Sequence, residues 1–157
     1  MKSYSSGYSD MEELKLILIV GPTASGKTAA SIYAATKLNG EIVSADSIQV
    51  YKGMDIGSAK PTMQERQGIP HHLMDAIDIN SPKFSVAEFR KMAGEAIEDI
   101  AGRGKQPIVV GGTGLYINSL VFPLNFTEVQ SDEKLRSELS EIEERQGRGT
   151  LHAMLQE

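Results

Sequence analysis

Residues 21–28 read Gly21-Pro22-Thr23-Ala24-Ser25-Gly26-Lys27-Thr28 and match the phosphate-binding loop pattern G-x-x-x-x-G-K-[ST]. The apolar run Leu14–Val20 before them predicts a buried strand, and the alanine-rich run after them predicts a helix over Gly26–Leu38. Because the glycines allow a tight turn, backbone N–H groups at the helix N-terminus can point inward at phosphate oxygens. Lys27 would reach the terminal phosphates, and the Thr28 hydroxyl would be a ligand of Mg²⁺. The stretch therefore predicts a site for a diphosphate or triphosphate, without saying which molecule carries it.

The overall composition is that of an ordinary globular protein. The chain has 157 residues, of which 40% are hydrophobic and 24% are charged, and its formal net charge is −5. This charge argues against a broad nucleic-acid-binding surface but leaves room for a local basic groove. No apolar run reaches 18 residues, so no membrane-spanning helix is predicted. The absence of cysteine excludes disulfides and thiolate zinc sites, and it is consistent with a cytoplasmic protein.

Strands alternate with helices across residues 14–124, which predicts a parallel sheet flanked by helices, an α/β fold like that of the phosphate-loop NTPases. The first helix ends at Asn39-Gly40. Three further strands are predicted, at Glu41–Ala45, Leu73–Ile77 and Pro107–Val110. Helices are predicted from Thr62 and over Ser85–Arg103, both starting with a capping box, and over Leu115–Leu120. Ligands of such sheets bind at the carboxyl ends of the strands, where Thr23, Asp46 and Thr113 fall.

Three parts of the chain are expected. Residues 1–13 lack the apolar core of a signal peptide and are predicted to be a disordered leader, and residues 14–124 form the core domain. Residues 125–157 are predicted to begin a helical insertion domain, with Ser131 capping a charged helix over Asp132–Gln146 and another helix starting at Thr150. The thin apolar stripe of the charged helix requires a partner helix. The small predicted sheet and the helix at the end of the chain suggest a fragment of a longer protein.

Three further blocks accompany the phosphate-binding loop in order: SADSIQVYKGMDIGSAKPT at 44–62, GIPHHL at 68–73 and VGGTGLY at 110–116. With that loop they closely resemble the tRNA dimethylallyltransferases. The resemblance covers the chain from about Leu14 to its end, and the family is considerably longer. It implies an enzyme that transfers a dimethylallyl (isopentenyl) group from dimethylallyl diphosphate to N6 of the adenosine 3′ of the anticodon in tRNA.

The resemblance also implies roles for particular residues. The loop Gly21–Thr28 would hold the diphosphate with Mg²⁺ on Thr28, while Asp46 and Thr23 would lie at the reacting centre, with Asp46 as proton acceptor. The tRNA would be contacted by the following residues: Asp46, Ser47, Ile48, Gln49 and Thr113. Gln49 could read an adenine edge with its paired donor and acceptor.

Each of these assignments has a plainer alternative. Asp46 could cap a turn or bind Mg²⁺, and Thr23 could bond to backbone. Gln49 could be an ordinary loop residue, and Thr113 could belong only to a tight strand-to-helix turn. Lys52 and Lys60 could touch phosphate or be solvated loop residues.

Other functions remain as alternatives on the sequence alone. The expected partners are the tRNA anticodon stem-loop and dimethylallyl diphosphate, with no membrane, and the full-length protein is expected to be a monomer. The strand at Pro107–Val110 ends in glycine rather than an acid, which argues against motors and GTPases. A nucleotide or small-molecule kinase and an adenylate isopentenyltransferase stay open. Because the family is considerably longer, this chain itself is expected to be an inactive or weakly active fragment, which could bind the diphosphate without turnover. Adjacent residues point apart in a strand, so His71-His72 are not predicted to bind a metal.

Overall fold

A computed structural model of the chain describes residues 15–81, 84–123 and 132–156. The chain divides into two compact units, Met1–Leu124 and Asn125–Glu157. The predicted leader at residues 1–13 and the predicted cap Ser131 lie outside the described residues. Within the described ranges, no helix has both the length and the apolar content needed to cross a bilayer.

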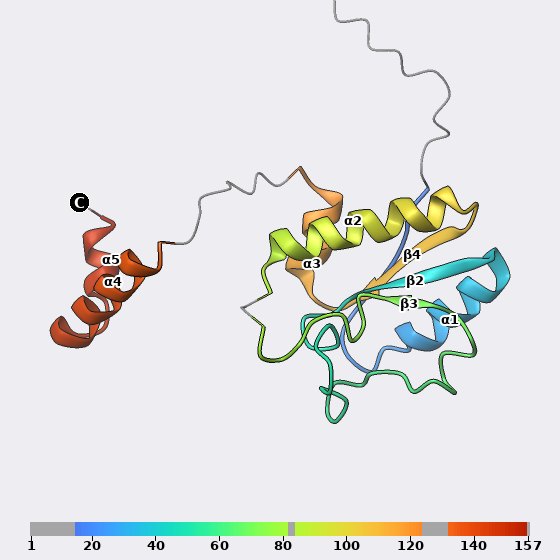
Figure 1. The fold of residues 1–157 in the computed structure, drawn as a ribbon, viewed down its shortest axis with the longest axis horizontal. Helices are drawn as coiled ribbons and strands as arrows, with labels where there is room; N and C mark the ends of the chain where they lie inside the picture. The colour runs from blue at the N-terminus through green and yellow to red at the C-terminus, as the bar shows by residue number, and fades with distance from the viewer. Residues whose placement is uncertain (1–14, 82–83, 124–131, 157) are drawn as a thin grey trace, which may run out of the picture. The chain divides into compact units, whose positions relative to one another are not determined.

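The first unit is built on a parallel sheet. In chain order its elements are β1 (Ile17–Val20), α1 (Lys27–Leu38), β2 (Gly40–Ala45), β3 (His71–His72), α2 (Val86–Gly102), β4 (Gln106–Gly111) and α3 (Gly114–Val121). The strands lie in the order β1-β4-β2-β3, and all of the pairings are parallel. Figure 1 shows α1 on one face of the sheet and α2 with α3 on the other. The predicted α/β fold is confirmed.

Side chains of the central strands alternate between two hydrophobic clusters because successive strand residues point to opposite faces. Ile42 of β2 and Ile108 of β4 pack in one cluster with Ile32 and Ala35 of α1. Their neighbours in sequence belong to the other cluster, which contains Val43, Val109 and the inward face of α2 and α3: Phe89, Ala93, Ile97, Ile100 and Tyr116. The Phe89 and Tyr116 rings stack with their centroids 4.1 Å apart. Burial of both sheet faces explains why the strands read as apolar runs.

The capping box at Ser85 forms as predicted and starts α2. The Glu88 amide donates to Ser85 Oγ (3.2 Å), and the Ser85 amide donates to Glu88 Oε2 (2.7 Å). The helix predicted from Thr62 is wrong, because residues 63–68 form turns. Its capping bonds between Thr62 and Glu65 do form. However, Gln67 (φ 49°) and Gly68 (φ 77°) adopt the left-handed conformation, so the helical geometry ends after a single turn.

The strand predicted at Leu73–Ile77 is also misplaced. The strand β3 lies at His71–His72, where it pairs with Ile42 and Val43 of β2. Leu73 (φ 59°) and Asp75 (φ 55°) are left-handed, which is incompatible with a continuous strand. Further along, Ile77 makes an isolated bridge with Tyr51. The segment after β3 is therefore attached to the 49–52 loop rather than to the sheet.

β2 is buried along its whole length, and it carries one charged side chain, Glu41, which is 2% exposed. The Glu41 carboxylate accepts bonds from Arg103 (2.7 and 2.8 Å), Lys105 (2.6 Å) and His72 Nε2 (2.7 Å). Mainly because of the bonds from Arg103, the pKa of Glu41 is held far below its usual range despite its burial. This ionic cluster joins the starts of β2 and β4 to β3 and the end of α2.

The second unit contains α4 (Glu133–Gln146) and α5 (Thr150–Met154), which pack against each other. Asp132 caps α4 by accepting the Leu135 amide at 3.0 Å. The thin apolar stripe of α4 is only partly buried: Leu139 and Ile142 are half-buried, and Leu135 is 50% exposed.

Candidate active site

A cavity of about 420 Å³ opens at the carboxyl ends of β2 and β4. The loop between β1 and α1 and the first turn of α1 form one part of its wall, with residues Thr23 through Ala29. Asp46 and Gln49 after β2, Val110 and Gly111 of β4, and Ser58 and Ala59 complete the lining. Ligands of parallel α/β sheets bind at this position, and the cavity brings the predicted loop and the predicted base Asp46 together.

Two residues of the phosphate-binding loop adopt the left-handed conformation. Gly26 (φ 83°) is left-handed immediately before α1 begins at Lys27, and Ala24 (φ 63°) is left-handed as well. The first turn of α1, including Thr28, therefore borders the cavity, where the helix N-terminus favours an anion. The Lys27 amine donates to the Pro22 carbonyl at 2.5 Å, so it lies across the loop.

Asp46 directly follows β2, and the turn after it fixes its carboxylate. Asp46 Oδ1 accepts the backbone amides of Ile48 (2.9 Å) and Gln49 (3.1 Å). Among the hydrogen bonds described, both contacts of this carboxylate use Oδ1, so Oδ2 keeps its capacity to accept a hydrogen bond. The plainer alternative of a turn cap is thus realised by one oxygen and does not exclude a chemical role for the other.

Close approach of β2 and β4 sets the position of Asp46. Gly111 pairs with Ala45, and a Cβ at Gly111 would overlap the Ala45 carbonyl oxygen. The backbone of β4 can therefore lie this close to the residue before Asp46 only because position 111 is glycine.

The Gln49 side chain bonds to other protein groups. Its Nε2 donates to the carbonyls of Ser58 (3.0 Å) and Ala59 (3.3 Å), and its Oε1 accepts from Ser44 Oγ at 3.3 Å. The amide thus holds two residues of the cavity wall. That Gln49 reads an adenine edge stays a prediction, and such reading would require these bonds to exchange.

Ser47 and Thr113 contact each other beside the cavity, although they are 66 residues apart in the chain. Thr113 Oγ1 accepts the Ser47 amide (3.1 Å) and donates to Ser47 Oγ (3.4 Å). Ile48 projects outward and is 45% exposed. These three predicted tRNA contacts therefore form one region next to Asp46, and they do not line the 420 Å³ cavity itself.

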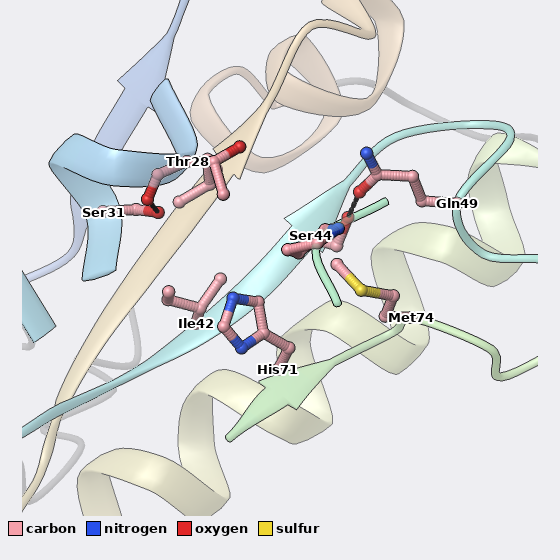
Figure 2. Close-up of a pocket in the computed structure, with 9 residues that line it drawn as sticks. Thr28, Ser31, Ile42, Ser44, Gln49, His71 and Met74 are labelled. Carbon is pink, nitrogen blue, oxygen red and sulfur yellow. Dashed lines mark hydrogen bonds between the residues drawn. The ribbon is translucent and has the colours of Figure 1, made fainter. Parts of the chain in front are cut away.

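A smaller cavity, of about 20 Å³, shares the lining residues Thr28, Gln49 and Val110 with the larger one. Figure 2 shows the His71 ring pointing from β3 into the space between α1 and β2. His71 Nδ1 bonds to the Ile69 carbonyl (2.8 Å), whereas His72 bonds to Glu41, so the two histidines have separate environments. Burial lowers the pKa of His71.

The 58–60 segment holds features that the sequence did not predict. Ser58 and Ala59 line the cavity without having been predicted to do so. Lys60 is not the solvated lysine that the sequence allowed: its side chain is 4% exposed and pairs with Asp55 and Asp75, and Lys60 does not line the cavity. Lys52, in contrast, is exposed. No local pattern marks a loop lysine that pairs with Asp75 of the irregular segment after β3.

Comparison with known proteins supports the resemblance seen in the sequence. A family model described as IPP transferase matches residues 49–157. The tRNA dimethylallyltransferase of an Exiguobacterium species is 53% identical over 145 residues, which cover 92% of this chain and 46% of the relative. The chain thus spans about half the length of the curated relatives it matches.

Solved structures show the same relationship. The full-length tRNA isopentenylpyrophosphate transferase of Bacillus halodurans superposes with a TM-score of 0.71 at 48% identity, covering 91% of this chain and 47% of that protein. A eukaryotic dimethylallyltransferase acting on tRNA gives a TM-score of 0.69 at 40% identity, covering 77% of this chain and 31% of that one. The chain therefore belongs to the IPP transferase family.

Proposed function

We propose that this protein transfers a dimethylallyl group from dimethylallyl diphosphate to N6 of the adenosine 3′ of the anticodon in tRNA. Family membership and the names of the relatives support the reaction. The observation that carries the proposal for this chain is the shared cavity, because it contains both the phosphate-binding loop and the carboxylate of Asp46. A group that binds a diphosphate and a group that accepts a proton are the two requirements of this chemistry.

The loop Gly21–Thr28 would bind the diphosphate through its backbone amides and the α1 N-terminus. Lys27 would exchange its bond to the Pro22 carbonyl for phosphate oxygens. Thr28 and Asp46 line the same cavity, and a hydroxyl oxygen such as that of Thr28 is a suitable ligand for Mg²⁺. When bound, Mg²⁺ would neutralise charge on the departing diphosphate.

In the transfer step, the adenine N6 amine forms a bond to the allylic carbon as the bond from that carbon to the diphosphate oxygen breaks. Diphosphate leaves with the electron pair, and the proton lost from N6 passes to Asp46. The turn that anchors Oδ1 holds the carboxylate in place and leaves Oδ2 as the acceptor. Thr23, which lines the same cavity, would lie near the reacting carbon.

The tRNA would approach over Ser47, Ile48 and Thr113. The target base must leave its stack to reach Asp46, as it does in other enzymes that modify bases. The exposed Ile48 side chain could contact the neighbouring base, and the Ser47–Thr113 contact would fix the turn that presents it. A tRNA substrate makes the cytoplasm the expected location.

The test compares dimethylallyl transfer to an anticodon stem-loop RNA by the wild type and by Asp46→Asn. Asparagine keeps an oxygen that can accept the Ile48 and Gln49 amides, but it cannot take the proton. We expect transfer to fall about 10²- to 10⁴-fold, with pyrophosphate affinity unchanged or higher. Glu95→Gln, at an exposed carboxylate on α2, serves as the control and should behave as wild type. An unchanged rate in Asp46→Asn would refute the assigned base.

A further inference from the structure

A buried lysine ties the 51–60 loop together. Lys60 Nζ donates to the Asp55 carboxylate (2.8 Å), the Asp75 carboxylate (2.7 Å) and the Tyr51 carbonyl (3.1 Å). Burial alone would lower the pKa of Lys60, but the two carboxylates reverse this effect and raise it, so the side chain stays charged. A buried ammonium group needs acceptors to replace the water it has lost, so it holds the two carboxylates and the Tyr51 carbonyl around it.

The three partners belong to segments that also pair through their backbones. The Asp75 amide donates to the Gln49 carbonyl (3.1 Å), and the Lys52 amide donates to the Ile77 carbonyl (2.9 Å). Asp75 is also 3.7 Å from Arg66. Lys60 thus connects the two ends of its own loop to the segment that follows β3.

The residues immediately before Lys60 are those that line the phosphate cavity, whereas Lys60 itself is not among the lining residues. Ala59 is held at φ 50°, a conformation that costs free energy for a residue with a Cβ. Ala59 lies between two sets of contacts. The Gln49 amide donates to the carbonyls of Ser58 and Ala59, and the Lys60 ammonium group donates to Asp55 of the same loop.

We propose that Lys60 is a positioning residue for the phosphate cavity: without contacting the ligand, its ammonium group fixes the part of the wall formed by Ser58 and Ala59. The inference rests on the proposed function, since it takes the cavity to be the diphosphate site. Lys60 acts on the cavity through its neighbours. Because the wall is ordered before the ligand binds, binding does not incur the entropic cost of ordering it.

Two readouts on the 157-residue chain test this role in Lys60→Met, with Lys60→Arg as the conservative variant and Lys52→Met as the matched control at an exposed lysine of the same loop. The first is the Gln49 side-chain amide signal in NMR spectra, which reports directly on its bonds to Ser58 and Ala59. The second is calorimetric affinity for inorganic pyrophosphate with Mg²⁺. We expect Lys60→Met to move the Gln49 signal to that of a free glutamine and to weaken pyrophosphate binding roughly fivefold to tenfold. Lys60→Arg should retain part of the wild-type Gln49 shift and part of the pyrophosphate affinity. Lys52→Met should change neither the Gln49 signal nor the affinity.

The proposal is overturned if Lys60→Met folds with the Gln49 signal and the pyrophosphate affinity of the wild type. If Lys60→Met does not fold, Asp55→Asn replaces it, because this partner carboxylate is 68% exposed and its loss is milder. Asp55→Asn should then shift the Gln49 signal in the same direction, and no shift would overturn the proposal. If the wild type fails to bind pyrophosphate, the proposed function fails, while the Gln49 signal still decides whether Lys60 positions the wall.

Discussion

Glycine at position 111 controls where the catalytic candidate lies. Gly111 is buried in β4, opposite Ala45, the last residue of β2, and Asp46 follows Ala45 directly. Any side chain at 111 must push the Ala45 carbonyl away, and the nearest consequence is a shift of Asp46 relative to the phosphate-binding loop. A small steric change outside the chemistry is therefore expected to affect both stability and catalysis.

We expect Gly111→Ala to reduce the free energy of unfolding by about 1–3 kcal/mol, the usual cost of overpacking. Urea denaturation followed by circular dichroism measures this change. Gly94→Ala is the matched control, because Gly94 lies inside α2 and a Cβ added there would meet open space. That variant should be about 1 kcal/mol more stable than wild type, since alanine favours helix over glycine. Equal stabilities of the two variants would contradict this role of Gly111.

At the same scale, the sequence predicted some site residues and could not predict others. Asp46 was predictable because an apolar run ending in aspartate marks a strand end beside the phosphate loop. The contact between Ser47 and Thr113 and the pairing of Lys60 with Asp75 were not, because they depend on how distant loops fold against each other. The role of Gln49 in holding Ser58 and Ala59 has the same origin.

Among the elements, β2 combines complete burial with a charged residue. Glu41 is tolerated inside because Arg103, Lys105 and His72 surround its carboxylate. Replacing the buried carboxylate would remove the shared acceptor of Arg103, Lys105 and His72 and would leave their partly exposed charges without it. The cluster therefore joins β2, β3 and β4 at the end of the sheet remote from Asp46.

We expect Glu41→Gln to lower the free energy of unfolding by about 3 kcal/mol at pH 7. The pKa of Glu41 is depressed in the folded state, so its contribution is present above the pKa of the unfolded chain and is lost as the pH falls. The difference in stability between wild type and Glu41→Gln should thus shrink as the pH drops below about 4. Urea titrations at several pH values provide the measurement.

Asp99→Asn is the control for this prediction. Asp99 also pairs with Arg103, at 2.8 Å, but its side chain is 61% exposed. Solvent screens such a pair, so its loss should cost less than about 1 kcal/mol. A cost as large as that of Glu41→Gln would show that burial does not set the strength of this cluster.

Element boundaries show the limits of local signals. Two capping boxes were recognised, and both form their hydrogen bonds, but only the one at Ser85 is followed by a helix. After Ser85 the apolar stripe of α2 packs on the sheet. After Thr62 the left-handed residues Gln67 and Gly68 end the helical geometry. The strand β3 was missed because two residues are too few to show an alternating pattern.

For the whole molecule, the parallel α/β fold could be predicted because strand, loop and helix signals alternate with little ambiguity. The second unit was predictable as helical, but its capping residue among the described residues is Asp132. The fold and the phosphate loop by themselves are shared with kinases and NTPases. The distinction came from the motif blocks, and the family comparison then agreed with it.

The measurement that tests the central claim most directly is calorimetric titration of this chain with dimethylallyl diphosphate and, separately, with ATP, each with Mg²⁺ and each repeated with Lys27→Ala. We expect the wild type to bind dimethylallyl diphosphate more tightly than ATP, and we expect Lys27→Ala to lose that binding. A clear preference for ATP, or binding of dimethylallyl diphosphate that does not depend on Lys27, would contradict the proposal that this loop holds a prenyl diphosphate.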